Sequence, residues 1–304
     1  MSRRVLLVVH HRRPDALDLA RSLAERLREA GVTSVINAAD LRGFAQRLDD
    51  VVEPADEDEA AGCELVCVLG GDGTILRGAE LARAHGTPVL GVNLGHVGFL
   101  AEAEREHFPD VVERIVHRDY VVEERLTLDV VVRQGDDEVQ RTWALNEATV
   151  EKASRQRMLE LAMEIDGRPL STWGCDGVVM ATPTGSTAYA FSAGGPVVWP
   201  TVEAILVVPL SAHALFARPL VLSPSAKVAV ELLPDQEATG VLWCDGRRTV
   251  DLPRGARVEV CRGQTPVRLA RLATAPFTDR LVRKFALPVD GWRGVAERNQ
   301  HHAD

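Results

Sequence analysis

The sequence lacks several features that would place it in other classes of protein. Its five cysteines are scattered and include no Cys-x-x-Cys pair, so they offer no zinc site and suit a reducing compartment. No segment approaches the ~18 consecutive apolar residues that a membrane-spanning helix needs. The apolar run Val5–Val9 is too short for a signal peptide and is typical of a first strand. We therefore expect a cytoplasmic protein.

Positive charge is also scarce. Lys and Arg number 35 against 44 Asp and Glu, which gives a formal net charge of −9 at pH 7. This balance argues against nucleic acid and against anionic membrane surfaces as partners, but it leaves room for an anionic small ligand in a locally basic cleft. With 304 residues, 46% of them hydrophobic, the chain is long enough for two domains with separate cores.

The first part of the chain alternates between strand and helix patterns. Repeated strand–helix units predict a parallel sheet covered by helices, in which ligands bind at the carboxyl ends of the strands. The acidic stretch Asp49–Glu59 is interpreted as a solvated, mobile loop. We expect strands at Val5–Val9, Val32–Ile36, Leu65–Leu69 and Val89–Val92, and helices over Pro14–Ala30, from Ile75 onward and around Phe108–Val116.

From about residue 120 the pattern changes to short alternating strands. Gly135-Asp136-Asp137 and Asp166-Gly167 each predict a hairpin turn between two such strands. We therefore expect a mostly β second domain. Residues 277–285 show a helical pattern again, and the polar residues after about 290 are expected to be disordered.

A glycine-rich turn, Gly70-Gly71-Asp72-Gly73-Thr74, joins a predicted strand to a predicted helix. Glycines at such a junction let backbone N–H groups approach a phosphate, and the helix N-terminus favours an anion. No Gly-Lys-Ser/Thr follows, so the turn is not a Walker A loop. Phosphates would repel Asp72 unless it binds a metal ion or removes a proton from an attacking hydroxyl. The turn thus suggests phosphoryl transfer to an alcohol; the alternative is a tight turn with Asp72 as N-cap.

Three further segments carry functional groups. Asn93–Leu100 contains two glycines that suggest close backbone packing or ligand approach, and His96 is either structural or catalytic. Asn146-Glu147 ends the predicted strand Thr142–Leu145, where an amide and a carboxylate could read base edges and ribose hydroxyls. Lys152, Arg155 and Arg157 form a basic cluster that either holds phosphates or is a solvated surface.

The densest signal runs from Gly174 to Pro196, where a strand leads into a turn rich in glycines and hydroxyl groups. Tyr189, one of two tyrosines in the chain, lies at that turn. An aromatic ring with backbone and hydroxyl donors suits an adenine or nicotinamide ring. A tight structural turn would not need so many small polar residues, so this turn is interpreted as a binding element.

Together these segments closely resemble the NAD kinase family. The resemblance runs in the family's order from the first strand to about residue 290. The glycine turn Gly70–Thr74 is shared with diacylglycerol-type lipid kinases and phosphofructokinases, whereas the long motif Asp176–Pro196 is far more specific to the NAD kinase family. The matching motifs are Gly70–Thr74, Asn93–Leu100, Leu145–Glu147, Asp176–Pro196 and Asp245-Gly246.

The resemblance implies a fold of the α/β plus all-β class. Residues 1–122 would form a Rossmann-like domain that carries the glycine turn, and residues 123–265 a β-sandwich that binds NAD. Residues 266–290, with a C-terminal helix, would return to pack on the first domain. Residues 291–304 would be a disordered tail.

The resemblance also implies residue roles. Asp72 would be the base that takes the proton from the 2′-hydroxyl of the adenosine ribose of NAD. The oxygen would then attack the terminal phosphate of ATP or polyphosphate, with Mg²⁺ or another divalent cation offsetting the charge. No protein residue is expected to be a metal ligand. The nucleotide-binding residues implied are Gly70, Gly71 and Gly73 for the donor phosphates; Asn146 and Glu147 for adenosine, with Glu147 accepting hydrogen bonds as a carboxylate; Asp176 for the other end of NAD; Thr187, Ala188, Tyr189, Ala190, Phe191 and Ser192 for the dinucleotide pocket; and Arg77 and Arg157 as cationic contacts.

The sequence departs from the family pattern at one position. Family members often have glutamine after the late Asp-Gly, where this chain has Arg247, so only a weak case remains for a phosphate contact there. Two alternatives stay open: a diacylglycerol-type lipid kinase and a catalytically silent NAD(P)-binding regulator. The family forms dimers and tetramers, so a homodimer or homotetramer is expected.

Overall fold

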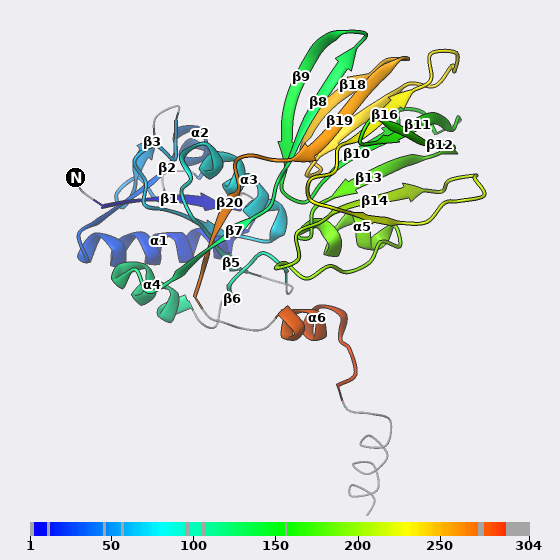
Figure 1. Ribbon diagram of the computed structural model, residues 1–304. Coiled ribbons are helices and arrows are strands. Elements are labelled where there is room, and N and C mark those ends of the chain that lie inside the picture. Colours follow the sequence, from blue (N-terminus) through cyan, green and yellow to red (C-terminus); the bar gives the residue numbers. More distant parts are fainter. Residues whose placement is uncertain are drawn as a thin grey trace, which may run out of the picture. The chain divides into compact units, whose positions relative to one another are not determined.

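The computed structural model describes residues 3–10, 13–44, 47–55, 58–94, 98–104, 108–155, 157–272 and 277–289. The chain divides into two compact units (Figure 1). One consists of Met1–Glu123 and Ala270–Asp304, and the other of Glu124–Leu269. The expected disordered tail, 291–304, and residues 95–97 of the Asn93–Leu100 motif lie outside the described residues.

The first unit is built on a parallel sheet with strand order β3-β2-β1-β4-β5. Beyond β5 the sheet continues through β20 to β7, the strands in which the chain passes between the units, and the short β6 pairs with β5. These strands are β1 (Arg3–Val9), β2 (Val32–Asn37), β3 (Glu53–Ala55), β4 (Leu65–Leu69), β5 (Val89–Asn93), β6 (Ala103–Glu104), β7 (Val121–Arg125) and β20 (Val267–Arg271).

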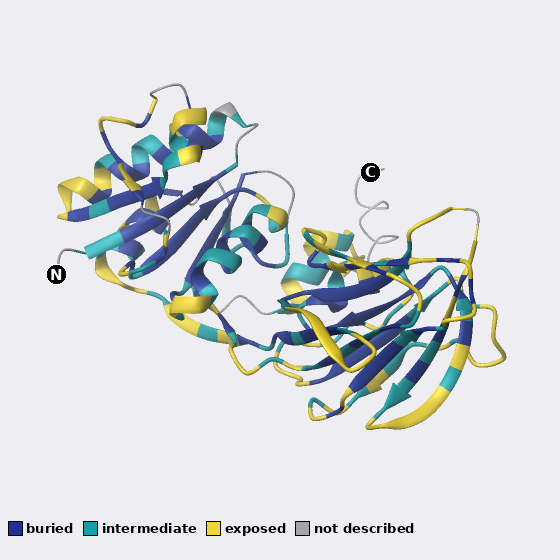
Figure 2. Ribbon diagram, turned by 90° about the horizontal axis from the view of Figure 1, so that it is seen from above, coloured by how far each residue is buried: buried dark blue, intermediate teal, exposed yellow. Residues whose placement is uncertain are grey.

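Helices cover both faces of this sheet. Leu23 and Leu27 of α1 and Ile115 of α4 share one buried core with Leu65 and Leu69 of β4. On the other face, α3 packs against β4 and β5. Figure 2 shows the inner strands as buried, with exposed residues mainly on helices, loops and edge strands. The helices of this unit are α1 (Pro14–Glu29), α2 (Ala38–Gly43), α3 (Asp72–Ala82), the short 3₁₀ helix η1 (Arg83–His85), α4 (Phe108–His117) and α6 (Phe277–Phe285).

The acidic stretch is not simply a solvated loop, so that interpretation was wrong for part of it. Val51 and Val52 are buried, and Glu53–Ala55 forms β3, which pairs in parallel with β2. Burying two apolar side chains and pairing with the backbone of β2 at the sheet edge stabilise this segment more than the hydration of its charged side chains favours a solvated loop. Its residues 56 and 57 lie outside the described part of the chain.

The second unit consists of two antiparallel sheets, with strand orders β15-β14-β13-β10-β17-β18 and β12-β11-β16-β19-β8-β9. Residues of both sheets form one core, so the unit is a β-sandwich. Both predicted hairpins are present, as β8–β9 and β11–β12. The strands are β8 (Leu128–Gln134), β9 (Asp137–Ala144), β10 (Glu147–Lys152), β11 (Leu159–Ile165), β12 (Arg168–Cys175), β13 (Gly177–Ala181), β14 (Ile205–Leu210), β15 (Leu220–Leu222), β16 (Val228–Leu232), β17 (Gly240–Cys244), β18 (Arg248–Leu252) and β19 (Ala256–Arg262).

A short helix covers the outer face of the first of these sheets. Along β13, Val178 and Met180 face the sandwich core, whereas Val179 and Ala181 pack in a separate small cluster with Ala190. Ala190 belongs to α5 (Tyr189–Ser192), which follows the 3₁₀ helix η3 (Gly185–Thr187). The alternation of β13 therefore fixes α5 and the turn before it against the sheet.

The α/β unit, the β-sandwich and the C-terminal helix that belongs to the first unit confirm the expected fold class.

Substitution of two glycines in α3, Gly78 and Gly73, can test how closely this helix packs against β4. A Cβ on Gly78 would lie 2.5 Å from Cγ2 of Val68, whereas nothing lies within 4 Å of a Cβ on Gly73. Alanine is normally the better helix former, but Val68 is β-branched and buried and cannot easily move aside. We predict that Gly78→Ala lowers the free energy of unfolding by about 1–3 kcal/mol.

The measurement is chemical unfolding of both variants, with Gly73→Ala as the matched control on the same helix. Gly73→Ala should be neutral or slightly stabilising. Equal stability of the two variants would contradict the close packing of α3 on β4.

Candidate functional site

Asp72 is the first residue of α3, and Gly71 is the N-cap. The alternative in which Asp72 is the N-cap is therefore wrong. The backbone N–H groups of Phe99 and Leu100 donate to the two carboxylate oxygens of Asp72, both at 3.3 Å. This contact explains Gly98, because a Cβ there would lie 2.3 Å from Oδ1 of Asp72. Two long hydrogen bonds leave the carboxylate with lone pairs for a further partner.

The three glycines of the turn have different surroundings. A Cβ on Gly70 would lie 2.5 Å from Oγ1 of Thr74, so packing within the turn requires glycine there. Apart from the adjoining residues and the backbone of the helix itself, no atom of the described residues lies within 4 Å of a Cβ on Gly71 or Gly73. The first turn of a helix also leaves backbone N–H groups without intrahelical partners. An anion could therefore approach the backbone at Gly71 and Gly73.

Arg77 lies on the same helix but is already engaged. Its guanidinium donates to Oδ2 of Asp40 at 2.7 Å, and Asp40 lies on α2. Five residues along an α-helix turn the chain by about 140°, so Arg77 and Asp72 are on different sides of α3. The structure therefore does not bring the Arg77 guanidinium to the Asp72 carboxylate.

In the second unit, a buried carboxylate holds the junction between β9 and β10. Asp245 is 5% exposed and accepts hydrogen bonds from the backbone N–H groups of Leu145 at 2.9 Å and Asn146 at 2.7 Å. The N–H of Glu147 donates to the same carboxylate at 3.4 Å. Arg248 pairs with Asp245 at 2.7 Å. The Asp-Gly motif therefore positions Asn146 and Glu147.

Asn146 and Glu147 carry polar atoms that are buried without a hydrogen-bond partner among the described residues, namely Oδ1 of Asn146 and Oε2 of Glu147. Both residues are 7% exposed. Buried polar atoms are almost always hydrogen-bonded in native proteins, so each unpaired one calls for an explanation. A ligand with hydroxyl or amino donors would supply these partners.

The environment of Glu147 also changes its charge. Burial, reinforced by the neighbouring Asp245, raises its pKa to about 8, while the backbone N–H of Tyr189 opposes the shift. At pH 7 the carboxyl group is then mostly protonated and can donate a hydrogen bond as well as accept one. That Glu147 accepts hydrogen bonds from a ligand stays a prediction, and its raised pKa adds that the protonated form can also donate.

The turn after β13 packs directly on Asn146. A Cβ on Gly185 would lie 2.0 Å from the carbonyl oxygen of Asn146. The hydroxyl of Thr182 donates to the carbonyl oxygen of Leu145 at 2.6 Å, and that of Ser186 to Pro183 at 2.7 Å. Both hydroxyl-bearing residues are fully buried. These two hydroxyl groups therefore stabilise the turn itself. For Thr182 and Ser186, the interpretation of the small polar residues as a binding element was wrong.

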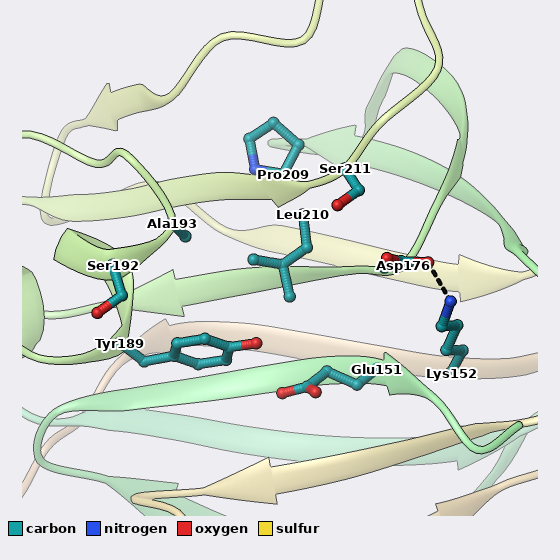
Figure 3. Close-up of a pocket in the computed structure, with 9 residues that line it drawn as sticks. All are labelled: Glu151, Lys152, Asp176, Tyr189, Ser192, Ala193, Pro209, Leu210 and Ser211. Atoms are coloured by element: carbon teal, nitrogen blue, oxygen red, sulfur yellow. Dashed lines mark ion pairs between the residues drawn. The ribbon is translucent and has the colours of Figure 1, made fainter. Parts of the chain in front are cut away.

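A pocket of about 510 Å³ opens in the second unit (Figure 3). Lys152 and Asp176 form an ion pair on its wall, and this pairing holds the pKa of Asp176 below its ordinary value. Tyr189, a residue that is 39% exposed, contributes its ring. The pocket is lined by Glu151, Lys152, Asp176, Tyr189, Ser192, Ala193, Pro209, Leu210 and Ser211.

Sequence reasoning named Asp176, Tyr189 and Ser192 among these lining residues but missed Glu151 and Ser211. A signal for Glu151 was available, because residues alternate sides along a strand. Recognising Glu147–Lys152 as strand β10 would have placed Glu151 on the same face as Glu147.

The remaining expected residues lie in varied settings. Thr187 and Ala188 are half-buried, and Phe191 is exposed. Ala190 is fully buried, so its side chain packs in the core cluster under α5. Arg157 is exposed and forms an ion pair with Glu237.

Two features noted in the sequence gain no support as binding groups. Arg247 is exposed after the turn at Asp245. His96 lies outside the described residues.

Among the described residues, no group of three or more His, Cys, Asp or Glu side chains could hold a metal ion. None of the helices in the described part of the chain is long and apolar enough to cross a membrane.

Comparison with known proteins adds independent evidence. The family model of the ATP-NAD kinase N-terminal domain matches residues 5–120, and that of the ATP-NAD kinase C-terminal domain matches residues 145–272. The NAD kinase of Thermobifida fusca is 64% identical over 308 residues, which cover 98% of this chain and 94% of that protein.

Two solved structures share the fold. A yeast NADH kinase complexed with NADH has a TM-score of 0.85 at 23% identity and covers 95% of this chain and 89% of its own. An NAD kinase from Archaeoglobus fulgidus in complex with ATP has a TM-score of 0.71 at 24% identity, covering 94% of this chain and 100% of its own. At these identities the likeness concerns the fold. Because two family models and a relative of nearly full length match this sequence, the chain belongs to the NAD kinase family.

Proposed function

We propose that this protein is an NAD kinase, which transfers the terminal phosphate of ATP to the 2′-hydroxyl of the adenosine ribose of NAD and so makes NADP. Polyphosphate is the alternative donor. The observation that carries the proposal is the placement of Asp72. Its carboxylate is held by two backbone N–H groups beside the uncovered backbone of Gly71 and Gly73. A carboxylate so near a phosphate-binding turn needs a task in the reaction.

That task is proton removal. Asp72 would accept the proton of the 2′-hydroxyl as the oxygen attacks the terminal phosphate. The backbone N–H groups around Gly71 and Gly73 would bind the donor phosphates, and Gly70 would keep the turn tight enough to present them. The hydrogen bonds from Phe99 and Leu100 would keep the carboxylate pointed at the acceptor.

A divalent cation such as Mg²⁺ would accompany ATP and offset the charge that develops on the transferring phosphate. Mg²⁺ is commonly held by substrate phosphates with only one or two protein carboxylates. The described residues fit this mode, because the Asp72 carboxylate beside the glycine turn accepts only two long hydrogen bonds and keeps lone pairs for a further partner.

The second unit would recognise NAD. The unpaired Oδ1 of Asn146 and Oε2 of Glu147 are suited to hydroxyl and amino donors of adenosine. The pocket at Tyr189 and Asp176 would take a further part of the dinucleotide, with the Tyr189 ring against a base. Residues Thr187 to Ser192 would shape this pocket through α5, with Ala190 acting from the core side.

Arg77 and Arg157 remain proposed cationic contacts. Each forms an ion pair in this structure, Arg77 with Asp40 and Arg157 with Glu237, so each would have to share or exchange its partner on binding a nucleotide. A homodimer or homotetramer and a cytoplasmic location also remain predictions, drawn from the family resemblance and the composition.

One assay tests this function against its alternatives. The purified protein is given ATP, Mg²⁺ and NAD, and new NADP is followed with an NADP-specific dehydrogenase. We expect NADP to form in step with ADP. In a parallel reaction, diacylglycerol vesicles replace NAD and should yield no phosphorylated lipid. A lipid product would support the lipid kinase alternative, and NAD binding without turnover would support a silent regulator.

The role of Asp72 predicts a selective loss of chemistry. Asp72→Asn keeps the shape and one acceptor oxygen but removes the basic site, so kcat should fall by about 10²–10⁴-fold. NAD affinity, measured by calorimetry, should stay near that of the parent. Asp110→Asn, an exposed change on α4, serves as the control. Near-normal turnover of Asp72→Asn would exclude the base role, and loss of both binding and turnover would indicate recognition instead.

The role of Tyr189 predicts a loss of binding. A ring against the nucleotide base contributes to ground and transition states alike, so its removal raises KM more than it lowers kcat. We expect Tyr189→Ala to raise the KM for NAD about tenfold, within the range for a lost base–aromatic contact. Tyr189→Phe keeps the ring and should stay near the parent. An unchanged KM in folded Tyr189→Ala would remove this residue from the site.

The raised pKa of Glu147 predicts a pH-dependent stability. The folded protein binds the Glu147 proton more tightly than the unfolded chain does. The resulting stabilisation is fully present below the ordinary pKa of 4.5 and is lost as the pH rises through about 8. Gln at this position has no proton to lose. The advantage of Glu147→Gln over the parent in melting temperature should therefore grow between about pH 5 and pH 9.

Thermal melts across this pH range make the measurement, with the exposed Glu160→Gln as the control. A constant difference between Glu147→Gln and the parent would show that Glu147 is charged throughout this range in the folded protein.

A further inference from the structure

The C-terminal helix α6 forms hydrogen bonds with the segment Phe99–Glu102, two of whose backbone N–H groups donate to Asp72. Arg280, on α6, donates through one guanidinium nitrogen to the carbonyl oxygens of Phe99 and Ala101, both at 3.0 Å. Its other terminal nitrogen donates to Oε1 of Glu102 at 2.6 Å. The segment from Phe99 to Glu102 therefore receives three hydrogen bonds from one side chain. All of these residues belong to the first unit.

One of these bonds acts on the same peptide group that binds Asp72. The carbonyl of Phe99 and the N–H of Leu100 belong to a single peptide unit, and in a trans peptide they point in opposite directions. The guanidinium of Arg280 is bonded to the oxygen end, and the carboxylate of Asp72 to the N–H end. Fixing one end of a rigid plane fixes the other, and hydrogen bonds in series polarise one another.

Aromatic packing supports the same contact. The ring of Phe99 lies 5.9 Å, centroid to centroid, from both Phe277 and Phe285, which come from the two ends of α6. Arg280 lies between them in sequence. The helix therefore holds Phe99 by its ring and by its backbone carbonyl.

The ion pairs around Arg280 are buried. Its side chain is 12% exposed, and that of Glu102 is 2% exposed. Glu102 also pairs with Arg271, which in turn pairs with Glu123 at 2.6 Å. Burying such a cluster costs desolvation energy that mutual attraction rarely exceeds by much. Its benefit is then geometric, because it fixes the position of the backbone next to Asp72.

We propose that Arg280 is a positioning residue for Asp72. It orients the Phe99–Leu100 peptide, and this peptide orients the carboxylate that removes the 2′-hydroxyl proton. This inference rests on the proposed role of Asp72 as the base. A shift of the base by about 1 Å can lower the rate of a reaction ~10²-fold without any loss of substrate contacts.

The test is a double-mutant cycle that combines Arg280→Ala with Asp72→Asn. We expect Arg280→Ala to lower kcat by about 10²-fold, with KM for NAD and for ATP within about twofold of the parent. In the Asp72→Asn background, Arg280→Ala should lower kcat by less than about twofold, because no base is left to position. Lys284→Ala, an exposed change on the same helix, is the control and should keep the parental kcat and KM.

Each outcome of the cycle either supports or overturns the positioning role of Arg280. A parental kcat in folded Arg280→Ala, an equal fall in both backgrounds, or a rise in KM that accounts for the whole loss would overturn the proposal. Normal turnover of Asp72→Asn alone would instead refute the base role on which it rests. If Arg280→Ala does not fold, Arg280→Gln keeps one amide donor without the charge. Its kcat should fall with unchanged KM, and a parental kcat there would overturn the proposal equally.

Discussion

Hydrogen bonds from backbone N–H groups to carboxylates set the local backbone geometry next to Asp72 in one unit and at Asn146 and Glu147 in the other. In the first unit, Phe99 and Leu100 donate to Asp72. In the second, Leu145, Asn146 and Glu147 donate to Asp245. In each case a loop is bent around an anion, so the loop and the side chain fix one another. The first arrangement leaves the Asp72 carboxylate with lone pairs for a further partner. The second holds two buried residues whose Oδ1 (Asn146) and Oε2 (Glu147) have no hydrogen-bond partner among the described residues.

The parts of the fold that depend on neighbouring residues could be predicted from the sequence. The run Leu65–Leu69 and the glycines after it are enough to indicate a strand that turns into a helix, and Asp166-Gly167 is enough to indicate a hairpin. The rest depends on contacts between residues far apart in the chain. Asp245 binds the N–H of Leu145, 100 residues away, and Arg280 binds Phe99, 181 residues away. No local pattern contains such pairs.

Hydrogen-bond partners and pKa shifts that depend on burial could not be predicted from the sequence either. Thr182 and Ser186 lie in a segment whose composition is typical of a binding loop. Their hydroxyls instead donate hydrogen bonds to backbone carbonyl oxygens, of Leu145 and Pro183 respectively. Nothing in the sequence sets Glu147 apart from an ordinary carboxylate, yet burial, reinforced by the neighbouring Asp245, raises its pKa to about 8. A protonated carboxyl group can both donate and accept a hydrogen bond, whereas a carboxylate can only accept. The family resemblance singled out this residue, and the shift of its pKa follows only from the burial that the fold imposes.

In the proposed mechanism the first unit carries out the chemistry and the second recognises NAD, and phosphate is transferred to one particular oxygen. Phosphorus-31 NMR of the product made from NAD and ATP by the purified protein tests this claim most directly. We predict one new phosphomonoester signal, coupled to the proton on the 2′ carbon of the adenosine ribose. A phosphate on the 3′-oxygen or on the nicotinamide ribose, or no phosphorylated dinucleotide at all, would contradict it.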